Sequence, residues 1–170
     1  MRPPRLYADV GNSALLWAVS GPAGWGPFAR MVLDPATDPR GTAGALRAAL
    51  EMAGCTPEEL IGAALVSSNP RLTDHVLTAL AGVAPEVVLL GRDLHSDLSI
   101  DYDAPGRFGQ DRIAALEGAR VLRGTPVVAM TCGTCLTAQA LTPEGGVLGG
   151  GIAPGLSVCV EGLCLSLIHI

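Results

Sequence analysis

The feature that most constrains the fold is a repeated pattern of two apolar, strand-like segments joined by a turn of small residues. Residues 5–20, RLYADVGNSALLWAVS, hold two short β-prone runs on either side of a Gly-Asn-Ser turn, which predicts a tight hairpin. Residues 125–141, TPVVAMTCGTCLTAQAL, repeat this pattern around a Gly-Thr turn. Two such units predict a fold built by duplication.

Between and after the two hairpins, helical and strand patterns alternate. We predict strands over 28–33, 61–67 and 86–91, and helices over 41–54, over 71–82, from about Gln110 and from Pro154. Antiparallel strands followed by alternating helices and strands are typical of an α/β domain with a mixed sheet. Functional residues gather at the carboxyl ends of strands in such sheets, where Asp9 and the Ser67 to Asn69 cluster are expected.

Composition sets the class of protein. The 170 residues are 49% hydrophobic and 16% charged, which suits one globular domain or two small ones that share a core. The formal charge is -5 and no basic stripe is present, so nucleic acid is not an expected partner. Apolar runs are too short to span a bilayer and the N-terminus lacks a secretory apolar region, so we expect a cytoplasmic protein without a membrane partner.

All eleven basic residues are arginine, so the lysine of a P-loop is missing, as is the GxxxxGK[ST] pattern. Any phosphate chemistry would rest on backbone N–H groups, hydroxyls, arginine and a metal ion. Asp9 stands beside the glycine turn of the first hairpin, where a carboxylate can hold Mg²⁺ while the turn approaches a phosphate. The alternative is that Asp9 only ends a strand.

The five cysteines are an odd number, which argues against a disulfide scaffold. Cys132 and Cys135 have the CxxC spacing of redox and zinc sites, but the three histidines stand apart and offer no second ligand pair. Because the pair lies in a predicted hairpin and not at a helix start, we interpret both thiols as small buried apolar groups.

Five motifs in order resemble the type III pantothenate kinase family, which belongs to the actin-like ATPase and sugar kinase superfamily. They are DVGNS at 9–13, SSNP at 67–70, YDAPGRFGQDR at 102–112, TCGTCLT at 131–137 and GGGIAPGL at 149–156. The resemblance implies a duplicated, ribonuclease H-like α/β fold with mixed sheets: a first domain over 1–113 and an incomplete second domain over 114–164. It also implies a homodimeric enzyme that phosphorylates pantothenate with ATP to 4'-phosphopantothenate, the first step of coenzyme A synthesis.

The resemblance assigns roles to individual residues. Asp111 matches the general base, Asp9 would bind Mg²⁺ directly or through water, and Arg112 would meet the carboxylate of pantothenate. The ATP-binding positions are Asp9, Val10, Gly11, Asn12, Ser13, Ala14, Leu15, Leu16 and Thr134. The substrate-binding positions are Tyr102, Gly109, Gln110, Asp111 and Arg112.

Asp111 and Arg112 also have purely structural interpretations, and one position departs from the family pattern. An acid such as Asp111 stabilises a helix N-terminus, and Arg112 could be a solvated helix cation. Family members usually carry Asp at position 131, where the carboxylate binds a monovalent cation, K⁺ or NH₄⁺. Thr131 brings an oxygen without charge, so a non-catalytic regulatory or accessory protein on the same fold is the alternative function.

The end of the chain also departs from the family, whose members continue further. Residues 165–170, LSLIHI, are the translation of CTGTCTCTTATACACATC, which resembles a transposon-end adapter of sequencing libraries. We therefore expect read-through into adapter sequence after residue 164, exposed apolar surface and an inactive fragment.

Overall fold

The computed structural model describes residues 3–12, 14–34, 36, 38–101 and 108–167, and it has two compact units, Met1–His95 and Ser96–Ile170. We expected a domain boundary after residue 113. The compact units divide earlier because Leu98 and Phe108 pack in one core with helix α3 (Gln110–Arg123). Leu98 and Phe108, which precede α3 in the sequence, are therefore part of the second unit's core.

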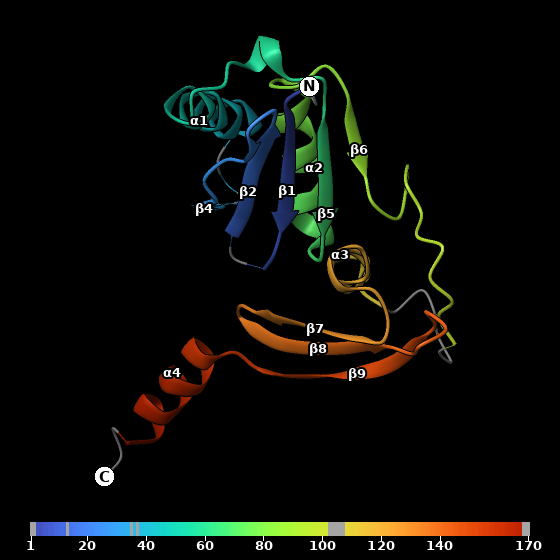
Figure 1. The fold of residues 1–170 in the computed structure, drawn as a ribbon. Helices are drawn as coiled ribbons and strands as arrows, with labels where there is room; N and C mark the ends of the chain where they lie inside the picture. Colours follow the sequence, from blue (N-terminus) through green and yellow to red (C-terminus); the bar gives the residue numbers. More distant parts are fainter. Residues whose placement is uncertain (1–2, 13, 35, 37, 102–107, 168–170) are drawn as a thin grey trace. The chain divides into compact units, whose positions relative to one another are not determined.

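The first unit is built on a mixed sheet (Figure 1). Its strands are β1 (Arg5–Val10), β2 (Ala14–Gly21), β3 (Gly24–Trp25), β4 (Ala29–Val32), β5 (Ala63–Ser67) and β6 (Val87–Leu89). The order is β3-β2-β1-β5-β6, and β4 also pairs with β2. Strand β1 is antiparallel to β2 and parallel to β5, and β5 is parallel to β6. This confirms the first predicted hairpin and the mixed α/β architecture.

Two helices form the core of the first unit with one face of this sheet. Helix α1 (Pro39–Met52) starts after Asp38, whose carboxylate accepts from the N–H of Arg40, and a short 3₁₀ turn follows over Pro57–Glu59. Helix α2 (Pro70–Ala81) starts after Asn69. Alternate strand residues point to the helices, because successive side chains in a strand face opposite ways. The fully or nearly fully buried side chains include Leu6, Val10, Leu15, Leu46, Leu50, Leu65, Val76 and Leu80.

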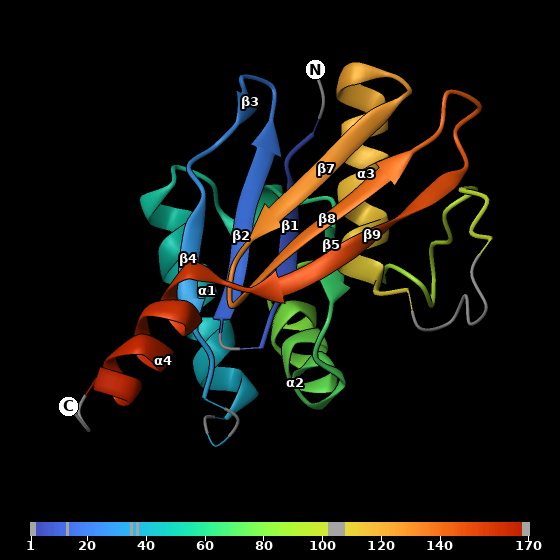
Figure 2. The same cartoon turned by 90° about the horizontal axis from the view of Figure 1, so that it is seen from below.

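The second unit is an antiparallel sheet covered on one face by α3 (Figure 2). Its elements after α3 are β7 (Val127–Cys132), β8 (Cys135–Leu141), β9 (Val147–Pro154) and α4 (Leu156–Leu167). Ile113 and Leu116 of α3 pack against Ala129 and Leu141 of the sheet. The second predicted hairpin is confirmed; its strands and β9 pair antiparallel, and Ile100 adds a parallel bridge to Val147 of β9.

The expected start of the last helix at Pro154 is wrong. Pro154 is the last residue of β9, where it pairs with Cys135, and α4 begins at Leu156. The backbone N–H of Gly155 donates to the carbonyl oxygen of Thr134 at 2.8 Å, so the chain stays bound to the β7–β8 turn for one residue after the strand. Tertiary hydrogen bonding therefore overrides the preference of proline for a first helical turn.

Large apolar side chains are exposed on the second unit. Met130 of β7 is 61% exposed and Leu148 of β9 is 73% exposed, and no described residue of α4 is buried. Apolar surface of this kind marks a contact surface or an aggregation hazard. None of the helices within the described ranges has the length and apolar composition needed to span a membrane.

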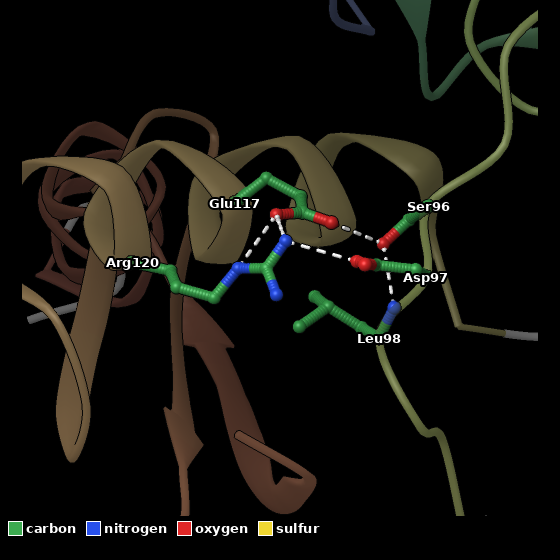
Figure 3. A network of polar contacts seen from close by, with 5 residues as sticks. All are labelled: Ser96, Asp97, Leu98, Glu117 and Arg120. Atoms are coloured by element: carbon green, nitrogen blue, oxygen red, sulfur yellow. Dashed lines mark hydrogen bonds and ion pairs between the residues drawn. The ribbon is translucent and has the colours of Figure 1, made fainter.

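A polar network joins the beginning of the second unit to α3 (Figure 3). The hydroxyl of Ser96 donates to Oε1 of Glu117 at 2.5 Å, and the guanidinium of Arg120 reaches both Oε2 of Glu117 and Oδ1 of Asp97. The hydrogen bond to Glu117 and, to a smaller extent, the one to Asp97 raise the pKa of Arg120. This network holds the chain ahead of Leu98, whose N–H donates to the Ser96 hydroxyl.

Candidate functional site

The first hairpin places Asp9 near the carboxyl end of β1. Asp9 is half-buried, with Leu16 of β2 on one side and Val66 of β5 on the other. The N–H of Gly11 donates to the carbonyl of Ala14 at 3.0 Å, which closes the turn. Ser13, expected to contact phosphate, lies outside the described residues.

The expected ATP-binding stretch divides into exposed and buried positions. Asn12 and Leu16 are exposed, whereas Val10, Ala14 and Leu15 are buried. Because the side chains of Val10 and Leu15 belong to the hydrophobic core, they can offer a ligand only their backbone groups. Any ligand contact in this hairpin would therefore have to come from Asp9, from the turn or from backbone N–H groups.

The Ser67 to Asn69 cluster lies directly beside this hairpin, as expected from the carboxyl ends of neighbouring parallel strands. The N–H of Ser68 donates to the carbonyl of Val10 at 2.9 Å, and its hydroxyl is 3.2 Å from the same oxygen. Thr73 of α2 donates from its hydroxyl to that of Ser67 at 2.8 Å. These contacts bring the start of α2 and the end of β1 to one edge of the sheet.

Asp111 lies in the first turn of α3, and it is half-buried. The helix is preceded by Gly109 as its N-cap residue, with no side-chain capping bond, and no hydrogen bond to the Asp111 carboxylate is found among the described residues. A Cβ atom at position 109 would collide with Oδ1 of Asp111. The carboxylate therefore lies over Gly109, and a capping hydrogen bond does not account for it.

Arg112 is enclosed by residues to which the sequence analysis assigned no role. Its guanidinium carbon lies 4.2 Å from the centre of the Phe108 ring, and its Nε donates to Oε1 of Gln139 at 3.4 Å. A Cβ at Gly150 would lie 2.9 Å from Nη2 of Arg112. Arg112 is therefore held against the sheet, which argues against the solvated-cation interpretation.

The second hairpin carries Thr131 near the end of β7 and Thr134 in the turn. The hydroxyl oxygens of Thr131 and Thr137 are 2.6 Å apart, across a paired position of β7 and β8. Thr134 is exposed, and its carbonyl is occupied by the N–H of Gly155. Thr134 therefore lies at an exposed turn whose backbone is fixed by the residue after β9.

The interpretation of Cys132 and Cys135 as buried apolar groups is wrong. Both are exposed, and they flank the Gly133–Thr134 turn at the turn end of the hairpin. Cys55, by contrast, is in the core of the first unit, and burial followed by the charge of Glu59 raises the pKa of its thiol. Over the described ranges, no three His, Cys, Asp or Glu side chains gather as a metal site.

The predicted residues fall in both units. Asp9 and its hairpin belong to the first unit, and Asp111, Arg112, Thr131 and Thr134 belong to the second, while Tyr102 lies outside the described residues. Within the second unit, β8 brings Gln139 to Arg112 and Thr137 to Thr131. Their period-two spacing along a strand was a usable signal, since residues 137 and 139 face the same side.

The comparisons with known proteins agree on one family. The model of the family described as type III pantothenate kinase matches residues 5–166. The chain is 31% identical over 161 residues to a type III pantothenate kinase of Halorhodospira halophila, covering 94% of this chain and 63% of that protein. It is 33% identical over 158 residues to the one from an Azoarcus species, covering 93% and 57%. The chain therefore spans less than two thirds of the length of these relatives.

Among solved structures, the fold is similar to that of an activator of 2-hydroxyisocaproyl-CoA dehydratase from Clostridium difficile with bound ADPNP. The TM-score is 0.53 at 9% sequence identity, and the match covers 89% of this chain and 46% of the other. This likeness in fold agrees with the actin-like ATPase class of α/β fold predicted from the sequence. The family match over nearly all of the chain, together with the five motifs in register, shows that the chain belongs to the type III pantothenate kinase family.

Proposed function

We propose that the complete protein carrying this sequence transfers the γ-phosphoryl group of ATP to the primary hydroxyl of pantothenate. The product is 4'-phosphopantothenate, and the reaction begins coenzyme A synthesis in the cytoplasm. Family membership supports the reaction, and the location of Asp111 supports the catalytic assignment. Its half-buried carboxylate lies in the first turn of α3 and makes no hydrogen bond among the described residues.

Asp111 would act as the general base. Its carboxylate would take the proton of the pantothenate hydroxyl while the hydroxyl oxygen bonds to the γ-phosphorus and the bond to the leaving oxygen of ADP breaks. Arg112 would orient the substrate by meeting its carboxylate with two N–H groups. The reaction then depends on positioning and on neutralised charge, which a chain without lysine can supply with arginine and backbone N–H groups.

Metal ions fit the donor groups of this chain in different degrees. Mg²⁺ commonly binds one or two protein carboxylates together with substrate phosphates, so Asp9 beside a glycine turn is a suitable ligand. When bound, Mg²⁺ would neutralise charge on the phosphates. The hydroxyl oxygens of Thr131 and Thr137 are suitable but uncharged donors for K⁺ or NH₄⁺. We also propose that the complete protein is a homodimer.

The experiment is a pantothenate phosphorylation assay on the complete protein with ATP and Mg²⁺, with and without K⁺, beside Asp111→Asn. Asparagine keeps the shape of the side chain but cannot take the proton, so we expect turnover to slow by about a hundredfold or more, as is typical when a general base is removed. Thr131 is the observation that favours the second candidate, a non-catalytic accessory protein. A folded complete protein without turnover in any salt would favour that candidate and overturn the kinase proposal.

A further inference from the structure

We propose that Gln139 and Phe108 are positioning residues that hold the guanidinium of Arg112 in place for an anionic group of the substrate. The contact geometry lies within the second unit, but the identity of the anionic group, a carboxylate, rests on the proposed function. Neither residue would touch the reacting atoms, so both would act through Arg112.

The contact with Arg112 determines the direction of the Gln139 side chain. A guanidinium has only donors, so the amide oxygen of Gln139 must face Arg112, and this fixes which way the amide points. Gln139 is 1% exposed, and its Nε2 group finds no hydrogen-bond partner among the described residues. An orphaned buried donor is unfavourable, so packing does not explain a glutamine at this position.

The plane of the Arg112 guanidinium is enclosed by Phe108 and by the backbone at Gly150. Phe108 is 4% exposed and offers its ring face at 4.2 Å, within the range of a cation–π contact. Gly150 of β9 lacks the Cβ atom that would approach Nη2 of Arg112 to 2.9 Å. One face and the Nε edge of the guanidinium are thus fixed by neighbours from the α3 entrance and from β8.

These contacts leave the positive charge of Arg112 available to an anionic ligand. The neutral acceptor on Gln139 holds Arg112 without cancelling its charge, and within the described part of the chain Arg112 makes no ion pair with a carboxylate. The two terminal nitrogens keep N–H groups for a bidentate contact with a carboxylate. Fixing this fork in advance lowers the entropy lost when the substrate binds.

The kinetic test compares Gln139→Met with Gln139→Glu in the complete protein. Methionine fills the space but removes the acceptor, so we expect KM for pantothenate to rise about tenfold while kcat and KM for ATP stay within about twofold. Glutamate keeps an oxygen facing Arg112 but adds a negative charge that pairs with the guanidinium, so KM for pantothenate should rise here too although Arg112 stays in place. Phe108→Leu should raise KM for pantothenate in the same direction. Thr42→Val, a buried polar change in the first unit, controls for general destabilisation.

A spectroscopic test is independent of activity. In ¹⁵N NMR spectra, the Nε–H of Arg112, assigned with Arg112→Lys, should be protected from solvent exchange in the parent and in Gln139→Glu, and unprotected in Gln139→Met. Suppose that the complete protein does not phosphorylate pantothenate, but that protection of the Arg112 Nε–H is lost in Gln139→Met. This result would support the positioning role and would overturn only the proposal that the protein is a pantothenate kinase. Unchanged protection and unchanged KM in Gln139→Met and Phe108→Leu would overturn the positioning role even where the kinase is active.

Discussion

The backbone N–H of Gly155 donates to the carbonyl oxygen of Thr134 at 2.8 Å, which fastens the end of β9 to the turn between β7 and β8. The approach is close enough that a Cβ at Gly155 would meet the carbonyl oxygens of both Gly133 and Thr134, the second at 2.7 Å. Because these are backbone atoms, no rotamer change relieves the collision. The conformation of the turn therefore depends on a glycine that follows β9.

Replacing Gly155 with alanine is expected to displace the Gly133–Thr134 turn. The overpacking should lower the free energy of unfolding by about 1–3 kcal/mol and, if Thr134 binds ATP phosphates, raise KM for ATP more than KM for pantothenate. The measurements are denaturant unfolding and steady-state kinetics on the complete protein. Gly151→Ala is the matched control, since a Cβ there meets nothing within 4 Å. Equal effects of both changes would contradict the special role of Gly155.

Asn69 should contribute to stability as the N-cap of α2. Its Oδ1 accepts from the N–H of Arg71 at 3.1 Å, which satisfies one of the unpaired donors of the first turn. We expect Asn69→Ala to lower the free energy of unfolding by about 1 kcal/mol, measured by urea denaturation. Asn69→Asp keeps the acceptor and should lie within a few tenths of a kcal/mol of the parent. A loss in Asn69→Asp as large as in Asn69→Ala would show that capping is not the cause.

Much of the fold is predictable because its signals are local. Apolar periodicity and glycine punctuation give α1, α2 and the start of α3 to within two residues, and Gly54 after α1 has a φ of 74°, in the left-handed region that favours glycine. The hairpins follow from turns of small residues between β-prone runs. The carboxyl-end rule also correctly places the Ser67 to Asn69 cluster beside the end of β1.

The parts that could not be predicted depend on contacts between distant residues. Pro154 ends a strand because β8 supplies a pairing partner, and nothing local to the proline indicates this. The formation of the short strand β3 and the exposure of Cys132 likewise depend on how neighbouring strands pack, which the local sequence does not indicate. In the candidate site, Arg112 belongs to a quoted sequence motif. Gln139 comes from β8, and its contact with Arg112 depends on the register of β7 and β8.

Asp93 gives a pH dependence whose sign can be stated. Hydrogen bonds from Arg92 and then from the N–H of Leu89 lower the pKa of the Asp93 carboxyl to about 2. Because the unfolded value is about 3.9, the ionised carboxylate stabilises the fold above about pH 4, and this contribution is lost as the pH falls toward 2.

The test is the free energy of unfolding of Asp93→Asn and of the parent at pH 5 and at pH 2. The variant should be less stable at pH 5, and the difference should shrink at pH 2, where the parent carboxyl is half protonated. Arg92→Met should weaken the pH dependence, since it removes the largest cause of the low pKa. A difference that stays constant between the two pH values would contradict this assignment.

Thr131 offers a direct test of whether residue 131 binds a monovalent cation. Its hydroxyl oxygen faces that of Thr137 at 2.6 Å, so the position presents uncharged oxygens where the family pattern has a carboxylate. Cation affinity rises with the charge of the ligands, so Thr131→Asp should lower the K⁺ concentration for half-maximal pantothenate phosphorylation by about tenfold. Thr131→Asn is the matched control, because asparagine has the size of aspartate and an oxygen donor without charge. If the two variants require the same K⁺ concentration, residue 131 is not a cation ligand, and the threonine is a neutral departure from the family pattern.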